Sequence, residues 1–234
     1  MKRSKLYAAR REAVDRARSY PLEEALQLLK DMPECKFDET VEIAFRLGVD
    51  PRQSDQAVRG AMVLPHGTGK TVRVAVAAEG EAADAAREAG ADVVGMADLI
   101  ERIQGGWLEF DIMIATPDAM KEVRKLGRML GPRGLMPNPK TGTVTDDTAA
   151  GVQQAKAGRV QYRTDRGGCV HVPVGKKSFE ASALEENARA VVDTLTKAKP
   201  DGIKGTYIRG IAVSLTMSPG IKIDLRSINK GATG

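Results

Sequence analysis

Two kinds of strand pattern occur along this chain, and their order restricts the folds that it can adopt. In VEIAFRLGV at 41–49, apolar and polar residues alternate, which is typical of a strand with one face on a core and one in water. RVQYRTDRGGCVHVPV at 159–174 predicts two such strands joined by a turn, and IAVSLTMSPGIKIDL at 211–225 predicts another pair. Helical spacing in 178–198 places a helix between the pairs. Both ends of the chain therefore predict antiparallel α+β structure.

The middle of the chain has a different pattern. VRVAVAA, ADVVG and DIMIAT are short, nearly continuous apolar runs, and they alternate with helical spacing around 81–90, 97–104 and 117–130. Strands buried on both faces have this composition, and the strand–helix order is typical of a parallel sheet. We therefore expect a three-layer, Rossmann-like α/β unit with a small parallel sheet.

These patterns predict two domains, one inserted into the other. Residues 1–66 and 159–234 form the antiparallel α+β domain, and residues 67–158 form the inserted α/β domain. Two chain crossings connect them, at PHGTG and at AGR, and two neighbouring crossings make a hinge. The glycines that we expect to serve as hinge points are Gly67, Gly69 and Gly158.

Basic charge is segregated along the sequence. The first eighteen residues hold seven basic and two acidic side chains, whereas 79–118 holds ten acidic and two basic ones. Residues 123–145 then hold five basic side chains and no acid. The net charge of +5 by itself only favours an acidic partner, but a segregated distribution favours a defined polyanion surface. The sequence leaves open whether the N-terminal basic segment is ordered without that partner.

The stretch GRMLGPRGLMPNPKTGTV at 127–144 continues the helix predicted around 117–130. On that helix Val123, Leu126 and Leu130 share one face, and basic residues occupy the other. We expect glycine to end the helix at 131 and prolines to stiffen the following loop. A merely solvated face is the alternative, but the lack of acids favours polyanion binding. The residues assigned to this contact are Lys121, Arg124, Lys125, Arg128, Arg133 and Lys140.

LPHGTGKT at 64–71 suggests an alternative class of protein, namely a two-domain α/β protein that binds a nucleotide or small ligand. A complete phosphate-binding loop needs glycine five positions before Gly69, where this chain has Leu64, and a helix should follow where a strand is predicted. We therefore interpret this segment as an interdomain crossing.

No enzyme, cofactor or metal is expected. Nucleophile, base and orienting acid do not occur in a recognisable order. Cys35 and Cys169 stand in unlike contexts without metal-ligand spacing. There is neither a secretory apolar run nor a membrane-length one, so we expect a cytoplasmic protein, with no membrane contact, that is a monomer when free.

Three segments together resemble a known family. KFDETVEIAFRLGVDPRQSDQAVRG at 36–60, the Gly-Pro stretch at 127–144 and TMSPG at 216–220 are similar to the bacterial members of the universal lateral-stalk protein family of the large ribosomal subunit. The resemblance implies a two-domain fold whose end-built domain binds the stalk region of the large-subunit ribosomal RNA. It also implies a ribosome-bound location, help in releasing transfer RNA from the exit site, and repression of the chain's own messenger RNA. A general RNA chaperone is a further alternative.

The resemblance also implies where the main RNA surface lies, namely at the start of the first strand and in the TMSPG turn. Phe37 either stacks on a base or sugar there or packs in the core, and Ser218 stands where the family usually has glycine. His171 is expected to point away from the apolar face, near Arg163 and Arg166 if the two strands form a hairpin. The main surface assigned is Lys36, Phe37, Thr40, Glu42, Arg163, Arg166, His171, Thr216, Met217 and Ser218.

Overall fold

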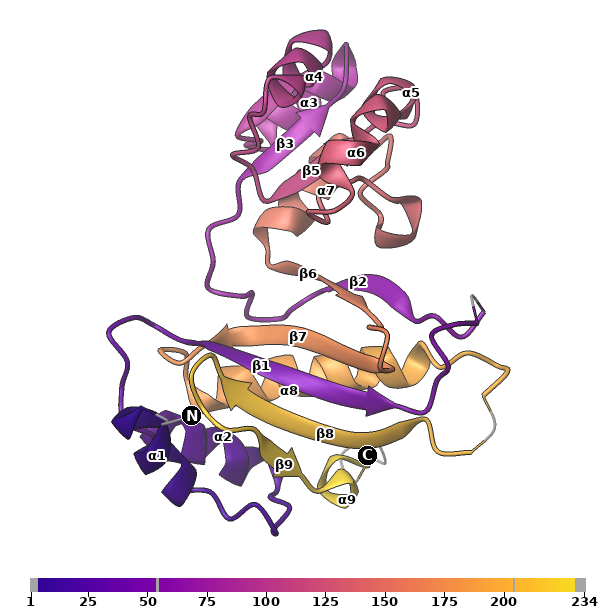
Figure 1. Cartoon of the computed structure of the whole chain (residues 1–234). Coiled ribbons are helices and arrows are strands. Elements are labelled where there is room, and N and C mark those ends of the chain that lie inside the picture. The colour runs from indigo at the N-terminus through magenta and orange to yellow at the C-terminus, as the bar shows by residue number, and fades with distance from the viewer. Residues whose placement is uncertain (1–3, 54, 204, 230–234) are drawn as a thin grey trace. The chain divides into compact units, whose positions relative to one another are not determined.

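The computed structural model describes residues 4–53, 55–203 and 205–229, and the chain divides into two compact units (Figure 1). Unit 1 comprises Met1–Gly69 and Val160–Gly234, and unit 2 comprises Lys70–Arg159. We propose that these units are the two domains expected from the sequence. Each is described by itself below.

Unit 1 is built on a four-stranded sheet in the order β7-β1-β8-β9, and every neighbouring pair is antiparallel. The central strand β1 shows the predicted alternation, because Val41, Ile43, Phe45 and Leu47 are all buried. The outermost strand β7 carries Pro173 opposite Glu42. The strand bounds are Thr40–Leu47 for β1, Cys169–Lys176 for β7, Ile208–Leu215 for β8 and Ile221–Ile223 for β9.

Helices cover one face of this sheet. α2 (Leu22–Asp31) and α8 (Ala181–Lys197) pack on each other and on the sheet, where Figure 1 shows α8 behind β7 and β1. The predicted helix over 178–198 is thus confirmed, whereas α2 was not anticipated. Two short helices complete unit 1, α1 (Lys5–Glu12) and α9 (Leu225–Asn229). Lys2 and Arg3, part of the predicted basic N-terminal segment, lie outside the described residues.

The expected hairpin across 165–168 is wrong. Strands do form on either side of this turn, but β6 (Arg159–Arg163) pairs with β2 (Arg59–Val63), and β7 pairs with β1. The turn itself is closed by Asp165, whose Oδ1 accepts hydrogen bonds from the amides of Gly167 and Cys169 at 2.8 and 2.7 Å. Gly168 then takes a positive φ of 77°, and its carbonyl accepts from the Leu47 amide at 2.9 Å. This bond directs the chain onto β1.

Unit 2 contains the predicted three-stranded parallel sheet, in the order β4-β3-β5. Its strands alternate between two cores: Ala75 and Ala77 of β3 face one, and Val74 and Val76 face the other. Apolar helix residues fill each core, so the three-layer prediction is confirmed. The bounds are Val74–Ala77 for β3, Val93–Gly95 for β4, Ile112–Ala115 for β5, Glu81–Glu88 for α3, Ala97–Gln104 for α4 and Thr148–Lys156 for α7.

The helix predicted around 117–130 is broken into three short pieces. They are α5 (Met120–Val123), a 3-10 turn η1 (Arg124–Leu126) and α6 (Gly127–Leu130), and a second 3-10 turn η2 (Pro139–Thr141) follows in the loop. A glycine such as Gly127 is a poor helix former, which explains a break at that point. The predicted packing face is retained, because Val123, Leu126 and Leu130 are all buried.

Asn187 of α8 anchors the first chain crossing to unit 1. Its side chain is fully buried, accepts from the His66 amide at 3.0 Å, and donates to the carbonyls of Gly67 and Val174 at 3.0 and 2.8 Å. The crossing glycines Gly67, Gly69 and Gly158 all have positive φ. Their service as hinge points stays a prediction.

We predict that Asn187→Leu destabilises unit 1 by about 3 kcal/mol, because one part-buried amide and two carbonyls lose their partner. Urea unfolding followed by circular dichroism measures this. Asp193→Leu, an exposed position on the same helix, is the control and is expected to change the unfolding free energy by at most about 0.5 kcal/mol. A loss below about 1 kcal/mol for Asn187→Leu would show that the crossing does not depend on this side chain.

Candidate nucleic-acid interface

Residues distant in sequence meet at one end of the unit 1 sheet. Thr40 begins β1, and Thr216 follows β8, whose last residue Leu215 pairs with Val41. The Thr40 amide donates to Thr216 Oγ1 at 3.2 Å, and Lys176 Nζ donates to Thr40 Oγ1 at 3.0 Å. Two hydroxyls and an ammonium group, all carried by the ends of rigid strands, are therefore held close together.

Two large apolar side chains close in sequence to these threonines are exposed. Phe37 is 54% exposed and Met217 is 52% exposed, and Val63 of β2 is the other exposed large hydrophobic residue in the described part of the chain. Phe37 therefore does not pack in the core, and its stacking on a base or sugar stays a prediction. An exposed flat ring and an exposed polarizable thioether each provide a surface on which an unstacked base can pack.

The Thr216–Ser218 turn accommodates serine without backbone strain. No described residue other than glycine has a positive φ, so Ser218 adopts an ordinary backbone conformation. Its Oγ accepts from the Leu215 amide at 2.8 Å and donates to the Pro219 carbonyl at 3.0 Å. The hydroxyl therefore serves to close the turn locally.

A buried ion pair lies beneath the turn. Arg10 and Glu39 are joined by two hydrogen bonds, from Nη1 to Oε1 at 2.9 Å and from Nη2 to Oε2 at 2.5 Å, and neither side chain is exposed. Glu39 Oε1 also accepts from the Met217 amide at 2.9 Å. Burial alone would raise the pKa of the Glu39 carboxyl, but the bonds from Arg10 and Met217 outweigh it and lower that pKa. The carboxylate is thus the stable form.

The face of the sheet opposite the helices is open and carries a groove of about 610 Å³. The small residues Ala44 of β1 and Ala212 of β8 are cross-strand neighbours at its floor. His171 of β7 lies on the other side of Ala44, and Lys222 of β9 lies on the other side of Ala212. Asp224 is the acidic residue among the side chains that line the groove. The basic ones are Arg46, His171, Arg209, Lys222 and Arg226.

Four of these basic residues were not predicted as site residues from the sequence. Arg46 was detectable, because strand alternation puts it on the same face as Glu42 and Ala44. Arg209, Lys222 and Arg226 become its neighbours only through the strand order. His171 is exposed as expected, but its cross-strand neighbour is Ala44, so the predicted link to Arg163 and Arg166 through a hairpin is absent. Arg163 and Arg166 are exposed at the end of β6 and in the following turn.

In unit 2, the predicted cationic stripe is exposed but partly neutralised. Lys121 pairs with Asp118 at 3.3 Å, and Lys125 pairs with Glu122 at 2.6 Å, both between exposed groups. Arg124 and Arg128 form no ion pair with the residues that the structure describes, and both are exposed. The two arginines are therefore the cations of the stripe that are best able to attract a phosphate.

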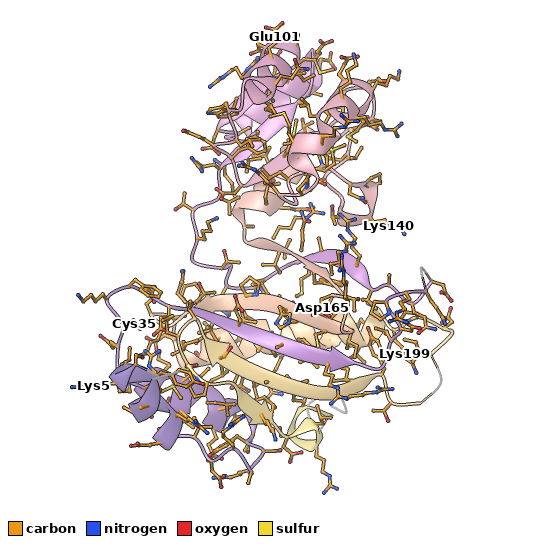
Figure 2. The ribbon with its side chains drawn as sticks, in the orientation of Figure 1. Lys5, Cys35, Glu101, Lys140, Asp165 and Lys199 are labelled. Carbon is orange, nitrogen blue, oxygen red and sulfur yellow. The ribbon has the colours of Figure 1, made fainter. Side chains whose placement is uncertain are left out.

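The loop after the stripe is held by Asn138. Its carbonyl accepts from the hydroxyls of Thr141 and Thr143 at 3.0 and 3.2 Å, and its side chain accepts from the Lys140 amide at 2.8 Å. Arg159 also donates to the Thr141 carbonyl. Lys140, labelled in Figure 2, therefore extends into solvent from a fixed backbone, and Arg133 is likewise exposed.

The partial phosphate-loop pattern at 64–71 does not lead into a helix. Within 64–71, Lys70 Nζ pairs with Asp111 at 2.6 Å, and the chain continues into β3 where a phosphate loop would start a helix. Among the described residues, no group of three or more His, Cys, Asp and Glu side chains is arranged to hold a metal. No described helix is long and apolar enough to cross a membrane.

The chain matches the model of the Ribosomal protein L1p/L10e family over residues 28–219. It is 58% identical over 225 residues to the large ribosomal subunit protein uL1 of Alkalilimnicola ehrlichii, which covers 96% of this chain and 97% of that protein. It is also 59% identical over 221 residues to the large ribosomal subunit protein uL1 of Methylobacillus flagellatus, covering 94% and 96% of the two chains.

The buried carboxylate predicts a pH dependence of stability. The pKa of Glu39 is lower in the folded state than its unfolded value of about 4.3, so the unfolded chain binds more protons in the acid range. The stabilisation is therefore complete above the unfolded pKa and is lost as the pH falls through the folded one. We expect the unfolding free energy of Glu39→Gln to fall less steeply than that of the unsubstituted chain between about pH 5 and pH 2.

At pH 7 we expect Glu39→Gln to be less stable by about 3 kcal/mol, because Arg10 keeps its buried charge without a full partner. Urea unfolding at a series of pH values measures both effects. Glu42→Gln removes an exposed glutamate three residues further on and is the control. Equal pH slopes for Glu39→Gln and Glu42→Gln would contradict the prediction.

Proposed function

The chain belongs to the Ribosomal protein L1p/L10e family, and on that basis we propose that unit 1 binds the stalk region of the large-subunit ribosomal RNA. Membership makes the chain a structural protein of the large ribosomal subunit, from a family that is not one of enzymes. Its place of action is then the ribosome in the cytoplasm.

One observation carries the proposal, namely the exposure of Met217 directly after Thr216, whose Oγ1 accepts from the Thr40 amide, with Phe37 exposed three residues before Thr40. Structured RNA is recognised mainly by its shape, through ribose hydroxyls, phosphates and unstacked bases. Threonine hydroxyls both donate to and accept from a ribose hydroxyl, and apolar side chains pack on bases. Lys176 lies beside Thr40 at this end of the sheet, Lys36 is exposed four residues before Thr40, and both suit a phosphate.

The open sheet face supports a larger footprint. β1 spans eight residues from Thr40 to Leu47, which is about 25 Å of extended chain. Small residues such as Ala44 and Ala212 allow close approach of a sugar–phosphate backbone, while Arg46, Arg209 and Lys222 line the groove with positive charge. We therefore propose that the RNA extends from the Thr216–Met217 turn along this face.

Unit 2 supplies the second contact in this proposal, through Arg124, Arg128, Arg133 and Lys140. Its phosphate contacts add affinity without sequence information. Two finer functions follow from the resemblance to the lateral-stalk family and belong to the proposal as well. They are assistance to the release of transfer RNA from the exit site and repression of the chain's own messenger RNA through a similar RNA fold.

We predict that Thr216→Val combined with Met217→Asp lowers affinity for a stalk fragment of the ribosomal RNA by at least about a hundredfold. The substitutions remove a ribose partner and put a carboxylate where a base packs. Filter binding at fixed salt measures the dissociation constant, and circular dichroism checks the fold. Val63→Asp, another exposed apolar residue in unit 1, is the matched control and is expected to retain affinity within a few fold.

Unchanged affinity in the double variant would refute the assignment of the turn. Competition by an unrelated structured RNA at equal concentration would favour a general RNA chaperone. Saturable ATP or GTP binding that Lys70→Ala abolishes would favour the nucleotide-binding class.

For unit 2, we predict that Arg133→Glu lowers RNA affinity less than the double substitution does, by at most about tenfold. The lost interaction is electrostatic, so the difference in RNA affinity between Arg133→Glu and the unsubstituted chain should shrink as salt rises from 50 to about 200 mM. A salt titration of the dissociation constant measures this. A larger loss than in the double variant would mean that unit 2 makes the main contact.

A further inference from the structure

The N-terminal helix α1 docks on unit 1 through an arginine. Arg10 is the buried residue of α1, and its side chain has no exposed surface. A guanidinium group is costly to remove from water, so its donors need defined partners. They have them, since Nε donates to the Pro33 carbonyl at 3.0 Å, Nη2 also donates to that carbonyl, and two bonds reach Glu39. Figure 2 labels Lys5 of this helix and Cys35 of the segment that Arg10 contacts.

Glu39 connects this docking site to the turn. The same Oε1 atom that accepts from Arg10 Nη1 also accepts from the backbone amide of Met217 at 2.9 Å. The Glu39 carboxylate therefore links the side chain of Arg10 to the backbone of Met217. The neighbouring Thr40 amide donates to Thr216 Oγ1, which holds the same turn from a second point.

The turn needs such support because it lies beyond the sheet. The β1–β8 ladder ends at the Val41–Leu215 pair, so the backbone at 216 and 217 has no strand partner. Met217 nevertheless presents an exposed side chain whose direction depends on its backbone. The bond from its amide to Glu39 fixes that backbone, and Arg10 fixes the two carboxylate oxygens in one orientation.

We propose that Arg10 is a positioning residue for RNA binding, which acts through Glu39 to hold the Thr216–Met217 turn in its binding conformation before RNA arrives. This inference rests on the proposed RNA-binding function of that turn. Arg10 does not contact RNA in this arrangement, because its side chain is fully enclosed. A lysine does not replace it, since one ammonium group cannot span the Pro33 carbonyl and both carboxylate oxygens in the same planar geometry.

The test uses the full chain with Arg10→Lys and Glu39→Gln, and Arg11→Lys as the matched control. Arg11 is the next residue of α1 and is exposed. Two quantities are measured at a temperature where each variant is folded. They are the dissociation constant for a stalk fragment of the ribosomal RNA and the hydrogen-exchange rate of the Met217 amide by NMR, with the Ile43 and Val213 amides in the centre of the sheet reporting unfolding of the whole unit.

We expect both Arg10→Lys and Glu39→Gln to weaken RNA binding by about tenfold, which corresponds to one lost hydrogen bond to a charged group. The Met217 amide should exchange at least about tenfold faster than in the unsubstituted chain through local opening, because its acceptor is no longer held. The amides of Ile43 and Val213 should be accelerated only by the factor that the loss of unfolding free energy gives, and a purely structural effect would produce this second change without the first. Arg11→Lys should change either quantity by at most about twofold.

Three results would overturn the proposal: unchanged RNA affinity in both variants, an unchanged exchange rate at Met217, or an equal loss in Arg11→Lys. The proposed function fails separately, if the unsubstituted chain ignores the RNA fragment. In that case the exchange rates would still decide whether Arg10 controls the Met217 backbone.

Discussion

The pairing of β1 with β7 on one side and β8 on the other is the constraint on which the rest of unit 1 depends. Because side chains alternate along β1, its register sends Val41, Ile43 and Phe45 into the core and leaves the opposite face open. The same register brings Thr40 next to Thr216, 176 residues away. A shift of the β1 register by one residue would expose the apolar side chains of the core, and it would also separate the residues of the proposed RNA surface.

The polar groups of this surface are fixed by two unlike means. Strand pairing holds Thr40 and Lys176, whereas the turn beyond the ladder depends on the enclosed Arg10–Glu39 pair. Such a pair contributes little net stability compared with an apolar replacement, but losing one partner is costly. Its value here is geometric, since it places a carboxylate under an otherwise unpartnered backbone amide. This makes α1, a helix with little apolar contact, part of the support of the site.

Periodicity alone predicted a good share of this fold. Alternation identified β1, β8 and the apolar face of α8, and continuous apolar runs identified the parallel strands. Strand partners were less predictable, since the turn at 165–168 has hairpin composition but Gly168 leads the chain onto β1. The exposure of Phe37 and the cluster of Arg46, Arg209 and Lys222 depend on strand order. Arg10 and Glu39 carry no local signal, because they stand 29 residues apart and meet only in the folded chain.

The two edge strands of the unit 1 sheet affect how readily free copies of the chain aggregate before they join a ribosome. β9 is only three residues long, and β7 carries Pro173, which has no amide hydrogen to offer to an incoming strand. In a newly made copy, the unpaired backbone groups along the sheet edges would otherwise allow fibril-like growth by strand addition. The short strand β9 at one edge and Pro173 at the other edge oppose that growth until the chain is assembled into a ribosome.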